Sequence, residues 1–248
     1  MARFEGRRVI VTGGGSGFGL AMAEAFANEG ASVVVADIDG EAAQRVAGKL
    51  PTAIACRVDV TKDDDNKAMA AAAVSAWGGI DIVCANAGGP HRSANLIDLP
   101  TDEFDRMFAL NVRSVYLAAK YCIPHMGPGS SIVATASIGG IRPRPGLTAY
   151  NAAKGAVITL VRGLATEVAP NVRVNAVLPV SAPTGFDKAA LGTDSMPEKL
   201  EKAVVRGIPM GRRADPVDVA NSVMFLASDE ASFLTGVCLD VDGGRSIQ

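Results

Sequence analysis

The sequence predicts a doubly wound α/β fold with a mostly parallel sheet, on the strength of two observations. Short runs rich in β-branched residues alternate along the chain with segments of helical length. Several of the runs are apolar throughout, as strands covered on both faces must be. Such alternation is typical of a parallel sheet whose strands are joined by right-handed crossovers. We therefore expect about seven parallel strands with helices on both faces of the sheet.

The expected strands are the β-branched runs, and the expected helices are the segments between them. In chain order the strands are RRVIVT (7–12), ASVVVAD (31–37), TAIACRVD (52–59), IDIVCANAG (80–88), SSIVATAS (130–137), NVRVNAVLP (171–179) and GVCLDVDGG (236–244). The helices occupy residues 19–29, 41–50, 63–77, 102–126, 148–168 and 216–227. The chain has 248 residues, 48% of them hydrophobic, which suits one sizeable core. We predict a single domain over residues 1–248.

The alternation breaks once, between residues 180 and 210. Prolines and glycines are frequent there among charged residues, and no clear strand is expected. A long irregular segment in a compact domain is usually functional or mobile. We predict that residues 180–210 form a mobile lid over a substrate site.

The charge balance argues against nucleic acid and membrane partners. Lys and Arg number 24 against 26 Asp and Glu, and a formal net charge of −2 gives no field that would attract a polyanion. No apolar run reaches the length of about 18 residues that a bilayer requires, and no secretory signal precedes the first strand. We expect small molecules, or further copies of this chain, as partners.

The cysteines indicate a reducing compartment. Cys56, Cys84, Cys122 and Cys238 are widely spaced, contain no C-x-x-C pair and lie among apolar neighbours. They are interpreted as buried thiols of a cytoplasmic protein. The chain has only two histidines, His91 and His125, and transition-metal sites are built mostly from His and Cys, so no catalytic metal site is expected.

A glycine loop, TGGGSGFG (12–19), lies between the first strand and the first helix. Backbone amides and a helix N-terminus can bind a pyrophosphate only where side chains do not obstruct them. The strict G-x-G-x-x-G spacing is absent, and Gly13 is instead followed by Gly17-x-Gly19. A tight turn without a ligand is the alternative. Because the loop sits at the carboxyl end of the first strand, we predict a Rossmann-type dinucleotide site.

Asp37 is expected to end the second strand, 20 residues after Gly17, where a carboxylate accepts hydrogen bonds from an adenosine ribose. The same carboxylate repels a 2′-phosphate. The nearby Ser16, Ile38 and Asp39 supply no cation for a phosphate-bearing cofactor. NAD is therefore favoured over NADP, with Asp37 and Ile38 in the site. A turn or N-cap role is the alternative for Asp37.

Tyr150 and Lys154 are four residues apart in an expected helix, so both can point into one space. An ammonium near a phenol stabilises the phenolate and lowers the tyrosine pKa towards the range useful for proton exchange. Y-x-x-x-K also arises often by chance, and a solvated helix face is the alternative. Ser137 and Asn86, which are expected to end the fifth and fourth strands, and Asn111 in the helix between them strengthen the catalytic interpretation.

With these motifs the chain resembles the short-chain dehydrogenase/reductase family over almost its whole length, residues 7–244. The resemblance implies that Ser137 holds the substrate oxygen and that Tyr150 exchanges its proton as general acid or base. It implies that Lys154 lowers the tyrosine pKa and bonds the nicotinamide ribose, and that Asn111 fixes a water in the proton relay from Lys154. No metal is required.

The resemblance also implies the residues that bind the cofactor. The phosphate loop would consist of Gly13, Ser16, Gly17, Phe18 and Gly19, and the adenine would contact Asp59 and Val60. The segment that borders the ribose would be Asn86, Ala87 and Gly88. The region around the carboxamide would be Pro179, Ala182 and Thr184.

Two departures from the family pattern stand out. Ala85 replaces the first asparagine of the usual Asn-Asn-Ala-Gly, a change expected to be harmless to the chemistry. More seriously, Pro179 is followed by Val180 where the family usually has glycine, and a second proline follows at Pro183. The added bulk is expected to shift the nicotinamide ring or to narrow the pocket. Thr184 still aligns with the threonine that would bond the carboxamide.

Three arginines, Arg92, Arg142 and Arg144, lie in segments expected around the nicotinamide end. They would suit a carboxylate or phosphate on the substrate. Charged loop residues usually face water, however, so solvent exposure is the default expectation for all three. We also expect His91, on a Gly/Pro-rich loop, to be exposed.

The leading hypothesis is an NAD-dependent oxidoreductase that interconverts a secondary alcohol and a ketone. A 3-oxoacyl carrier-protein reductase that uses NADPH is the second hypothesis, and a non-catalytic NAD(H)-binding sensor or scaffold is the third. The resemblance further implies a homo-oligomer, typically a tetramer, with helices 102–126 and 148–168 as the dimer surface.

Overall fold

The computed structural model describes residues 2–248 and contains a sheet of seven parallel strands. The strands are β1 (Arg8–Thr12), β2 (Ser32–Asp37), β3 (Ala53–Arg57), β4 (Ile80–Ala85), β5 (Met126–Thr135), β6 (Val172–Pro179) and β7 (Cys238–Val241). Their order in the sheet is β3-β2-β1-β4-β5-β6-β7. The predicted fold class is therefore confirmed.

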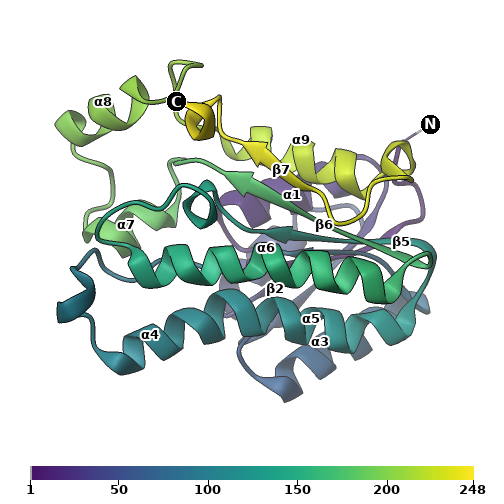
Figure 1. Cartoon of the computed structure of the whole chain (residues 1–248). Coiled ribbons are helices and arrows are strands. Elements are labelled where there is room, and N and C mark those ends of the chain that lie inside the picture. The colour runs from purple at the N-terminus through teal and green to yellow at the C-terminus, as the bar shows by residue number, and fades with distance from the viewer. Residues whose placement is uncertain (1) are drawn as a thin grey trace.

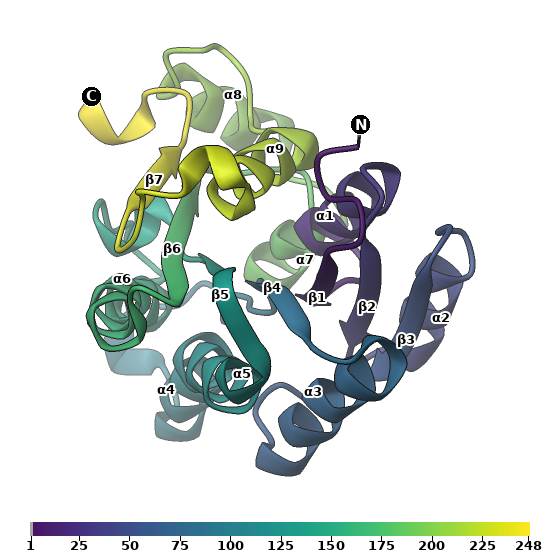
Figure 2. The ribbon, with the colours of Figure 1, turned by 90° about the vertical axis from the view of Figure 1, so that its right-hand side faces the viewer.

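Nine α-helices of the described residues connect the strands or follow them. They are α1 (Gly17–Asn28), α2 (Gly40–Ala47), α3 (Asp63–Trp77), α4 (Thr101–Phe108), α5 (Ser114–Cys122), α6 (Thr148–Val168), α7 (Gly185–Leu191), α8 (Glu198–Arg206) and α9 (Pro216–Ala227). Figure 2 shows α3, α5 and α6 on one side of the sheet and α1 and α9 on the other.

The core consists of two apolar layers separated by the sheet. In β1, Ile10 packs into the layer shared with α3, α5 and α6, whereas Val9 and Val11 pack into the layer shared with α1, α2 and α9. Successive side chains of a strand point to opposite faces, so a strand that is apolar throughout is buried on both sides. This is the property from which the parallel sheet was predicted.

The helix predicted over residues 102–126 is divided into parts. It consists of α4, a π-helical turn (Ala109–Arg113), α5 and a short turn (Ile123–His125). A π turn has no sequence signature comparable to a proline or a glycine, which is why the uninterrupted helix was expected.

The strand predicted over residues 130–137 begins and ends earlier, because β5 covers Met126–Thr135. Gly127, Pro128 and Gly129 disfavoured a strand prediction, yet Met126 pairs with Ile80 of β4 across a register shift. No helix of residues 2–248 has the length and apolar character required to cross a bilayer.

The segment predicted to be irregular, residues 180–210, contains two helices, α7 and α8. Thr184 is the N-cap of α7, where its hydroxyl accepts the backbone N–H of Phe186, and Gly192 ends the helix in the left-handed region. The glycines and prolines thus border two short helices. In Figure 1, α7 and α8 lie at the end of the molecule towards which the arrowheads of β6 and β7 point.

The strand order reverses between β1 and β4, because β2 and β3 follow on one side of β1 and β5 to β7 on the far side of β4. Ligands of doubly wound sheets bind beyond the carboxyl ends of the strands at this switch point. The loops after β1 and β4 therefore border the expected ligand crevice.

Candidate active site

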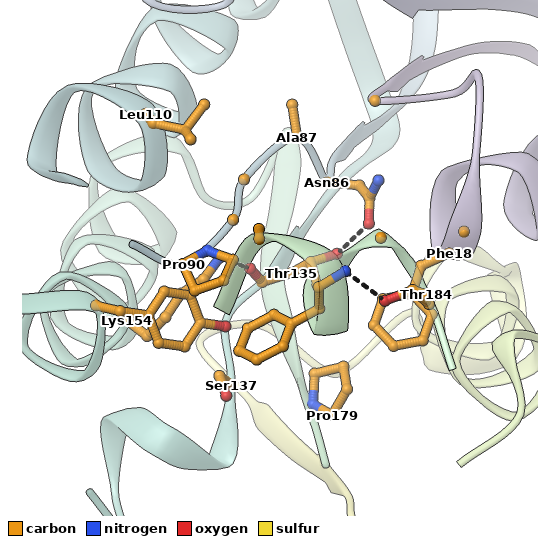
Figure 3. A pocket seen from close by; sticks show the side chains of 18 of the residues that line it. Phe18, Asn86, Ala87, Pro90, Leu110, Thr135, Ser137, Lys154, Pro179 and Thr184 are labelled. Carbon is orange, nitrogen blue, oxygen red and sulfur yellow. Dashed lines mark hydrogen bonds between the residues drawn. The ribbon is translucent and has the colours of Figure 1, made fainter. Parts of the chain in front are cut away.

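A cavity of about 410 Å³ opens at the carboxyl edge of the sheet, beyond the β1–β4 junction. Every residue predicted to bind the cofactor or to act in catalysis lines it, except Gly19 and Asn111. Figure 3 shows Lys154 across the cavity from Phe18 and Thr184, with Ser137 between the two sides. The structure thus brings the predicted residues into one space.

The glycine loop presents backbone to the cavity. Gly13 and Gly17 have φ values of 66° and 53°, in the region that favours glycine. A side chain on Gly19 would collide with the Gly13 carbonyl, so Gly19 contributes close packing of α1 on the loop. Ser16 is the N-cap of α1, yet its hydroxyl makes no bond to the helix. An unobstructed N-terminus of this kind fits the diphosphate of a dinucleotide.

Asp37 lies at the end of β2 and lines the cavity beside Ile38, which is 62% exposed. Its carboxylate accepts the backbone N–H of Gly15 at 2.8 Å and that of Asp39 at 3.0 Å. The second bond is the turn role that the sequence left open, while the N-cap of α2 is Asp39. A carboxylate offers about four acceptor positions, so Asp37 can also accept from a ribose.

The charges along the cavity are unevenly placed. Among the described residues, the cations that line it are Arg144 and Lys154, which belong to the part of the cavity formed by Tyr150. Arg57 pairs with Asp37 in the sheet register, but its side chain lies along Gly40 outside the lining. The Asp37 region therefore lacks a cation suited to a 2′-phosphate.

Asn86 ties the ends of three strands together from a position one residue beyond β4. Its amide nitrogen donates to the carbonyl of Thr12 at 2.9 Å. Its amide oxygen accepts from the hydroxyl of Thr135 at 3.1 Å, as Figure 3 shows. The hydroxyl of Thr12 accepts the backbone N–H of Asn86 and of Ala87, each at 3.0 Å. The Asn-Ala-Gly segment is thereby fixed across the β1–β4 junction.

Ser137, Tyr150 and Lys154 are all buried and reach the cavity from two neighbouring elements. Ser137 lies two residues beyond β5, not at its end as predicted, and its hydroxyl accepts the backbone N–H of Gly139 at 3.0 Å. Tyr150 and Lys154 come from the first two turns of α6. The Lys154 Nζ lies 5.8 Å from the centroid of the Tyr150 ring and donates to the carbonyl of Thr135 at 2.7 Å.

Burial governs the titration of the two groups on α6. It raises the pKa of the Tyr150 phenol, while the Ser137 hydroxyl and the Arg144 guanidinium act in the opposite direction. Burial also lowers the pKa of Lys154 to about 8. Desolvation of the phenol outweighs those two opposing effects, and the Lys154 ammonium donates to the carbonyl of Thr135 rather than to the phenol. A lowering of the Tyr150 pKa by Lys154 therefore stays a prediction.

Asn111 lies behind the cavity in the π turn, fully buried. Its amide nitrogen donates to the carbonyls of Gly89 and Met107, both at 3.0 Å, and its amide oxygen accepts the backbone N–H of Gly89 at 3.1 Å. A Cβ on Gly88 would stand 2.7 Å from that oxygen and 3.1 Å from the Lys154 Nζ. Asn111 thus holds the loop after β4 close to Lys154.

The segment after β6 carries the departure at Val180. The backbone N–H of Val180 donates to the carbonyl of Val241 at 3.2 Å, and its side chain packs against the core layer of α3, α5 and α6 while lining the cavity. Ala182 is buried beside it, and Thr184 faces Gly17 of the glycine loop. The added bulk of Val180 is therefore accommodated partly by the core.

Arg213 anchors this segment from the loop before α9. Its guanidinium donates to the carbonyl of Ala182 at 2.6 Å, to the hydroxyl of Ser181 at 3.0 Å and to the carboxylate of Asp187 at 2.7 Å. The Arg213 and Asp187 side chains are 7% and 4% exposed. This buried ion pair joins the strand end to α7.

The loop residues differ in their surroundings. Arg92 is exposed, as expected, and Arg142 donates to the carbonyl of Arg245 away from the cavity. Arg144 lines the cavity, and both it and Arg142 are half-buried, so the default expectation of a solvated side chain is wrong for these two arginines. The exposure predicted for His91 is also wrong: the residue is 1% exposed, and its Nδ1 lies 2.7 Å from the carbonyl oxygen of Arg92.

The sequence did not identify several residues that shape the site. Thr12 and Thr135 position Asn86 and Lys154, and Phe186 packs against Tyr150 with the ring centroids 5.5 Å apart and the rings at 71°. Thr12 was visible as the first residue of the glycine loop. Phe186 had no signal, because only the path of α7 brings it to α6.

Comparison with known proteins finds a family model and a curated relative that each match nearly the whole chain. The family model described as enoyl-(acyl carrier protein) reductase matches residues 13–246. A 4-formylbenzenesulfonate dehydrogenase of Comamonas testosteroni is 47% identical over 245 residues, which cover 96% of this chain and 97% of the relative.

Two solved structures have the same fold and substantial identity. One is a 3-ketoacyl-(acyl-carrier-protein) reductase from Brucella melitensis complexed with NADH, with a TM-score of 0.91, 42% identity, and coverage of 98% of this chain and 99% of the other. The other is a 7α-hydroxysteroid dehydrogenase complexed with NADH and 7-oxo glycochenodeoxycholic acid, with a TM-score of 0.90, 34% identity, and coverage of 98% and 95%.

Proposed function

Because the chain belongs to the short-chain dehydrogenase/reductase family, we propose that it interconverts a secondary alcohol and a ketone with NAD, through Tyr150 as general acid or base. It is an NAD(P)-dependent oxidoreductase that acts on CH–OH groups, so the interpretation as a sensor without turnover is set aside. The observation that carries the proposal is the meeting of Ser137, Tyr150 and Lys154 in the cavity that Asp37 also lines.

The nicotinamide, when bound, supplies or accepts the hydride, and this chain provides the proton and the orientation. The Ser137 hydroxyl would hold the substrate oxygen beside Tyr150, which takes the hydroxyl proton in oxidation and returns one in reduction. Lys154 would bond the ribose, and Asn111 would support the proton relay through its hold on Gly89. The T-shaped packing of Phe186 on Tyr150 keeps water from that side of the phenol.

The test follows the absorbance of NADH with a panel of secondary alcohols and ketones. Tyr150→Phe removes only the hydroxyl, so we expect turnover to fall by about 100-fold or more with NADH binding retained. Tyr116→Phe on the outer side of α5, where the residue is 47% exposed, is the matched control and should retain full activity. Undiminished turnover by Tyr150→Phe would overturn the mechanism.

The choice of NAD rests on Asp37 and on the absence of a lining cation beside it in the described residues. The neighbour named as a 3-ketoacyl-(acyl-carrier-protein) reductase keeps the alternative of a 3-oxoacyl carrier-protein reductase in view. That alternative, as framed from the sequence, uses NADPH. Tighter binding of NADPH than of NADH, together with turnover of an acyl-carrier-protein thioester, would favour it.

A second candidate activity is the oxidation of an aldehyde, favoured by the 47% identity to a protein named for 4-formylbenzenesulfonate. The hydrate of an aldehyde presents the same H–C–O–H unit as an alcohol. Loss of its hydroxyl proton to Tyr150 and of its hydride to NAD would leave a carboxylic acid and NADH. Aldehydes belong in the same panel, and acid formation distinguishes this reaction from alcohol oxidation.

Three further properties are part of the proposal. A homotetramer would use the outer faces of α4 to α6, where Ala152 is exposed, whereas Ala118, Ala119 and Ala153 are buried against the sheet. Light scattering tests the tetramer.

Residues 180–210 would act as a lid over the substrate site. The four free thiols suit a protein of the reducing cytoplasm.

A further inference from the structure

We propose that Arg144 determines substrate specificity by binding an oxyanion, a carboxylate or sulfonate, on the substrate whose reacting carbon lies at Tyr150. The substrate would carry an apolar, preferably aromatic, body between the two groups. This inference rests on the proposed function and names its substrate class.

The position of Arg144 is fixed relative to Tyr150. The side-chain amide of Asn151, the residue next to Tyr150 on α6, donates to the carbonyl of Arg144 at 2.8 Å. The same loop is held from the other side, because the backbone N–H of Ala94 donates to the carbonyl of Gly146 at 3.0 Å. A cation held in this way can bind one end of a substrate and so orient its reacting carbon at Tyr150.

The Arg144 guanidinium lacks a counter-ion within the protein. Its Nε is buried and has no hydrogen-bond partner, and none of the carboxylates in residues 2–248 forms an ion pair with it. Asp187 is the carboxylate that acts on it electrostatically, and that group is already bound by Arg213 at 2.7 Å. Arg245, the other charged group that acts on it besides Tyr150, is a cation.

A half-buried cation without a counter-ion is costly, since its desolvation is not repaid by a partner. Burial accordingly lowers the pKa of Arg144. Such a group is explained when a ligand supplies the missing anion, and a guanidinium binds carboxylate and sulfonate oxygens through two parallel N–H donors.

Phe186 connects the two groups. The Arg144 Cζ lies 6.0 Å from the Phe186 ring centroid, and the Tyr150 ring lies 5.5 Å from that same centroid. The guanidinium and the phenol therefore both lie against the same ring. Pro90, Leu110 and Val180 add apolar surface to the cavity. An aromatic body fits this wall, with its anion at Arg144 and its carbonyl carbon at Tyr150.

The other arginines of these loops provide a contrast. Arg142, two residues earlier, is bound to the carbonyl of Arg245 and does not line the cavity, and Arg92 lies against Gly192 on the surface. Arg142 is therefore a matched control, with the same residue type and the same loop but no access to the substrate.

The experiment compares the reduction of para-acetylbenzoate, para-acetylbenzenesulfonate and neutral para-methylacetophenone with NADH. We expect the wild type to prefer the anions in kcat/KM, and Arg144→Gln to reduce that preference on the order of 10- to 100-fold, mainly through KM. Arg142→Gln should leave the preference intact. Because the preference is a ratio, any common effect of the Arg144 charge on the Tyr150 pKa cancels.

A binding measurement separates this inference from the proposed function. Calorimetry of para-toluate with the protein–NADH complex requires no turnover, and Arg144→Gln should weaken binding at least tenfold. Arg144→Lys, which keeps the charge but loses the two-pronged geometry, should bind with intermediate affinity. Toluate binding that is absent from the wild type or unchanged in Arg144→Gln would overturn the role of Arg144. Toluate binding without turnover of any carbonyl compound would instead refute the proposed function alone.

Discussion

The Lys154 ammonium donates a hydrogen bond of 2.7 Å to the carbonyl of Thr135, the last residue of β5. The lysine charge is thus held at the sheet edge, 5.8 Å from the centre of the Tyr150 ring, while the side chain is buried and lines the cavity. A cation in this position is available to a ligand in the cavity, although burial weakens its hold on the proton.

The first prediction concerns the pH dependence of cofactor binding. Burial lowers the pKa of Lys154 to about 8, so the free protein loses this charge as the pH rises through that value. If the ribose accepts a hydrogen bond from the ammonium, binding favours the protonated lysine, and the Kd for NADH should rise above pH 8 by up to about tenfold per pH unit. Fluorescence titration between pH 6.5 and 9.5 measures the Kd for NADH. Lys154→Met should bind more weakly and without this pH dependence, and an identical slope in that variant would refute the assignment.

Asp37→Ser should change the preference between cofactors. Removal of the carboxylate abolishes a charge-assisted hydrogen bond to the ribose and its repulsion of a 2′-phosphate, so kcat/KM should fall roughly 10- to 100-fold with NADH and rise with NADPH. Asp39→Ser is the control, since Asp39 lies outside the cavity lining and serine also caps a helix. Steady-state kinetics with both cofactors tests this prediction. An unchanged ratio of kcat/KM with NADH to kcat/KM with NADPH in Asp37→Ser would contradict it.

Arg213→Met should destabilise the fold. The substitution leaves the Asp187 carboxylate buried and unpaired, at a cost of about 3–5 kcal/mol in the free energy of unfolding. The adjacent Arg212 pairs with Asp218 at the surface, so Arg212→Met should cost less than about 1 kcal/mol. Urea denaturation measures the free energy of unfolding of both variants. Combining Arg213→Met with Asp187→Leu should recover part of the loss, and equal effects of the two single arginine variants would rule out a special role for the buried pair.

Gly19→Ala should abolish cofactor binding, because the new Cβ would collide with the backbone carbonyl of Gly13 and displace the loop. Gly163→Ala introduces the same methyl group on α6, where nothing lies within 4 Å, and should stabilise the protein by about 1 kcal/mol. NADH titration and thermal denaturation of both variants test the pair of expectations. Normal NADH affinity in Gly19→Ala would show that the loop tolerates movement.

The elements that were predicted correctly depend on short-range patterns. Strands buried on both faces produce continuous apolar runs, as in β1 and β2, and the glycine loop marks a strand-to-helix turn by its composition. Tyr150 and Lys154 share a face because of helical spacing alone. Their meeting with Ser137 follows from the rule that parallel strands end at one edge.

The features that were missed depend on how distant segments pack. Whether Arg144 turns inward is set by Asn151 and the loop around Gly146, and the burial of His91 by the path of its loop. The π turn at Asn111 and the two helices after Val180 have no distinctive local composition. The pKa of Tyr150 depends on desolvation, which no spacing of residues reports.

The bonds of Asn86 to Thr12 and Thr135 have a consequence for folding kinetics. Thr12 and Asn86 are 74 residues apart in the chain, and strands β2 and β3 must be formed or left aside before β4 can enter the sheet next to β1. Contacts of such long range are made late, since loop closure precedes any gain from them. The cavity is also lined by Tyr150 of α6 and by Thr184 after β6. A nascent chain emerging from the ribosome therefore completes its nucleotide site only after β6 and the start of α7 have been synthesised.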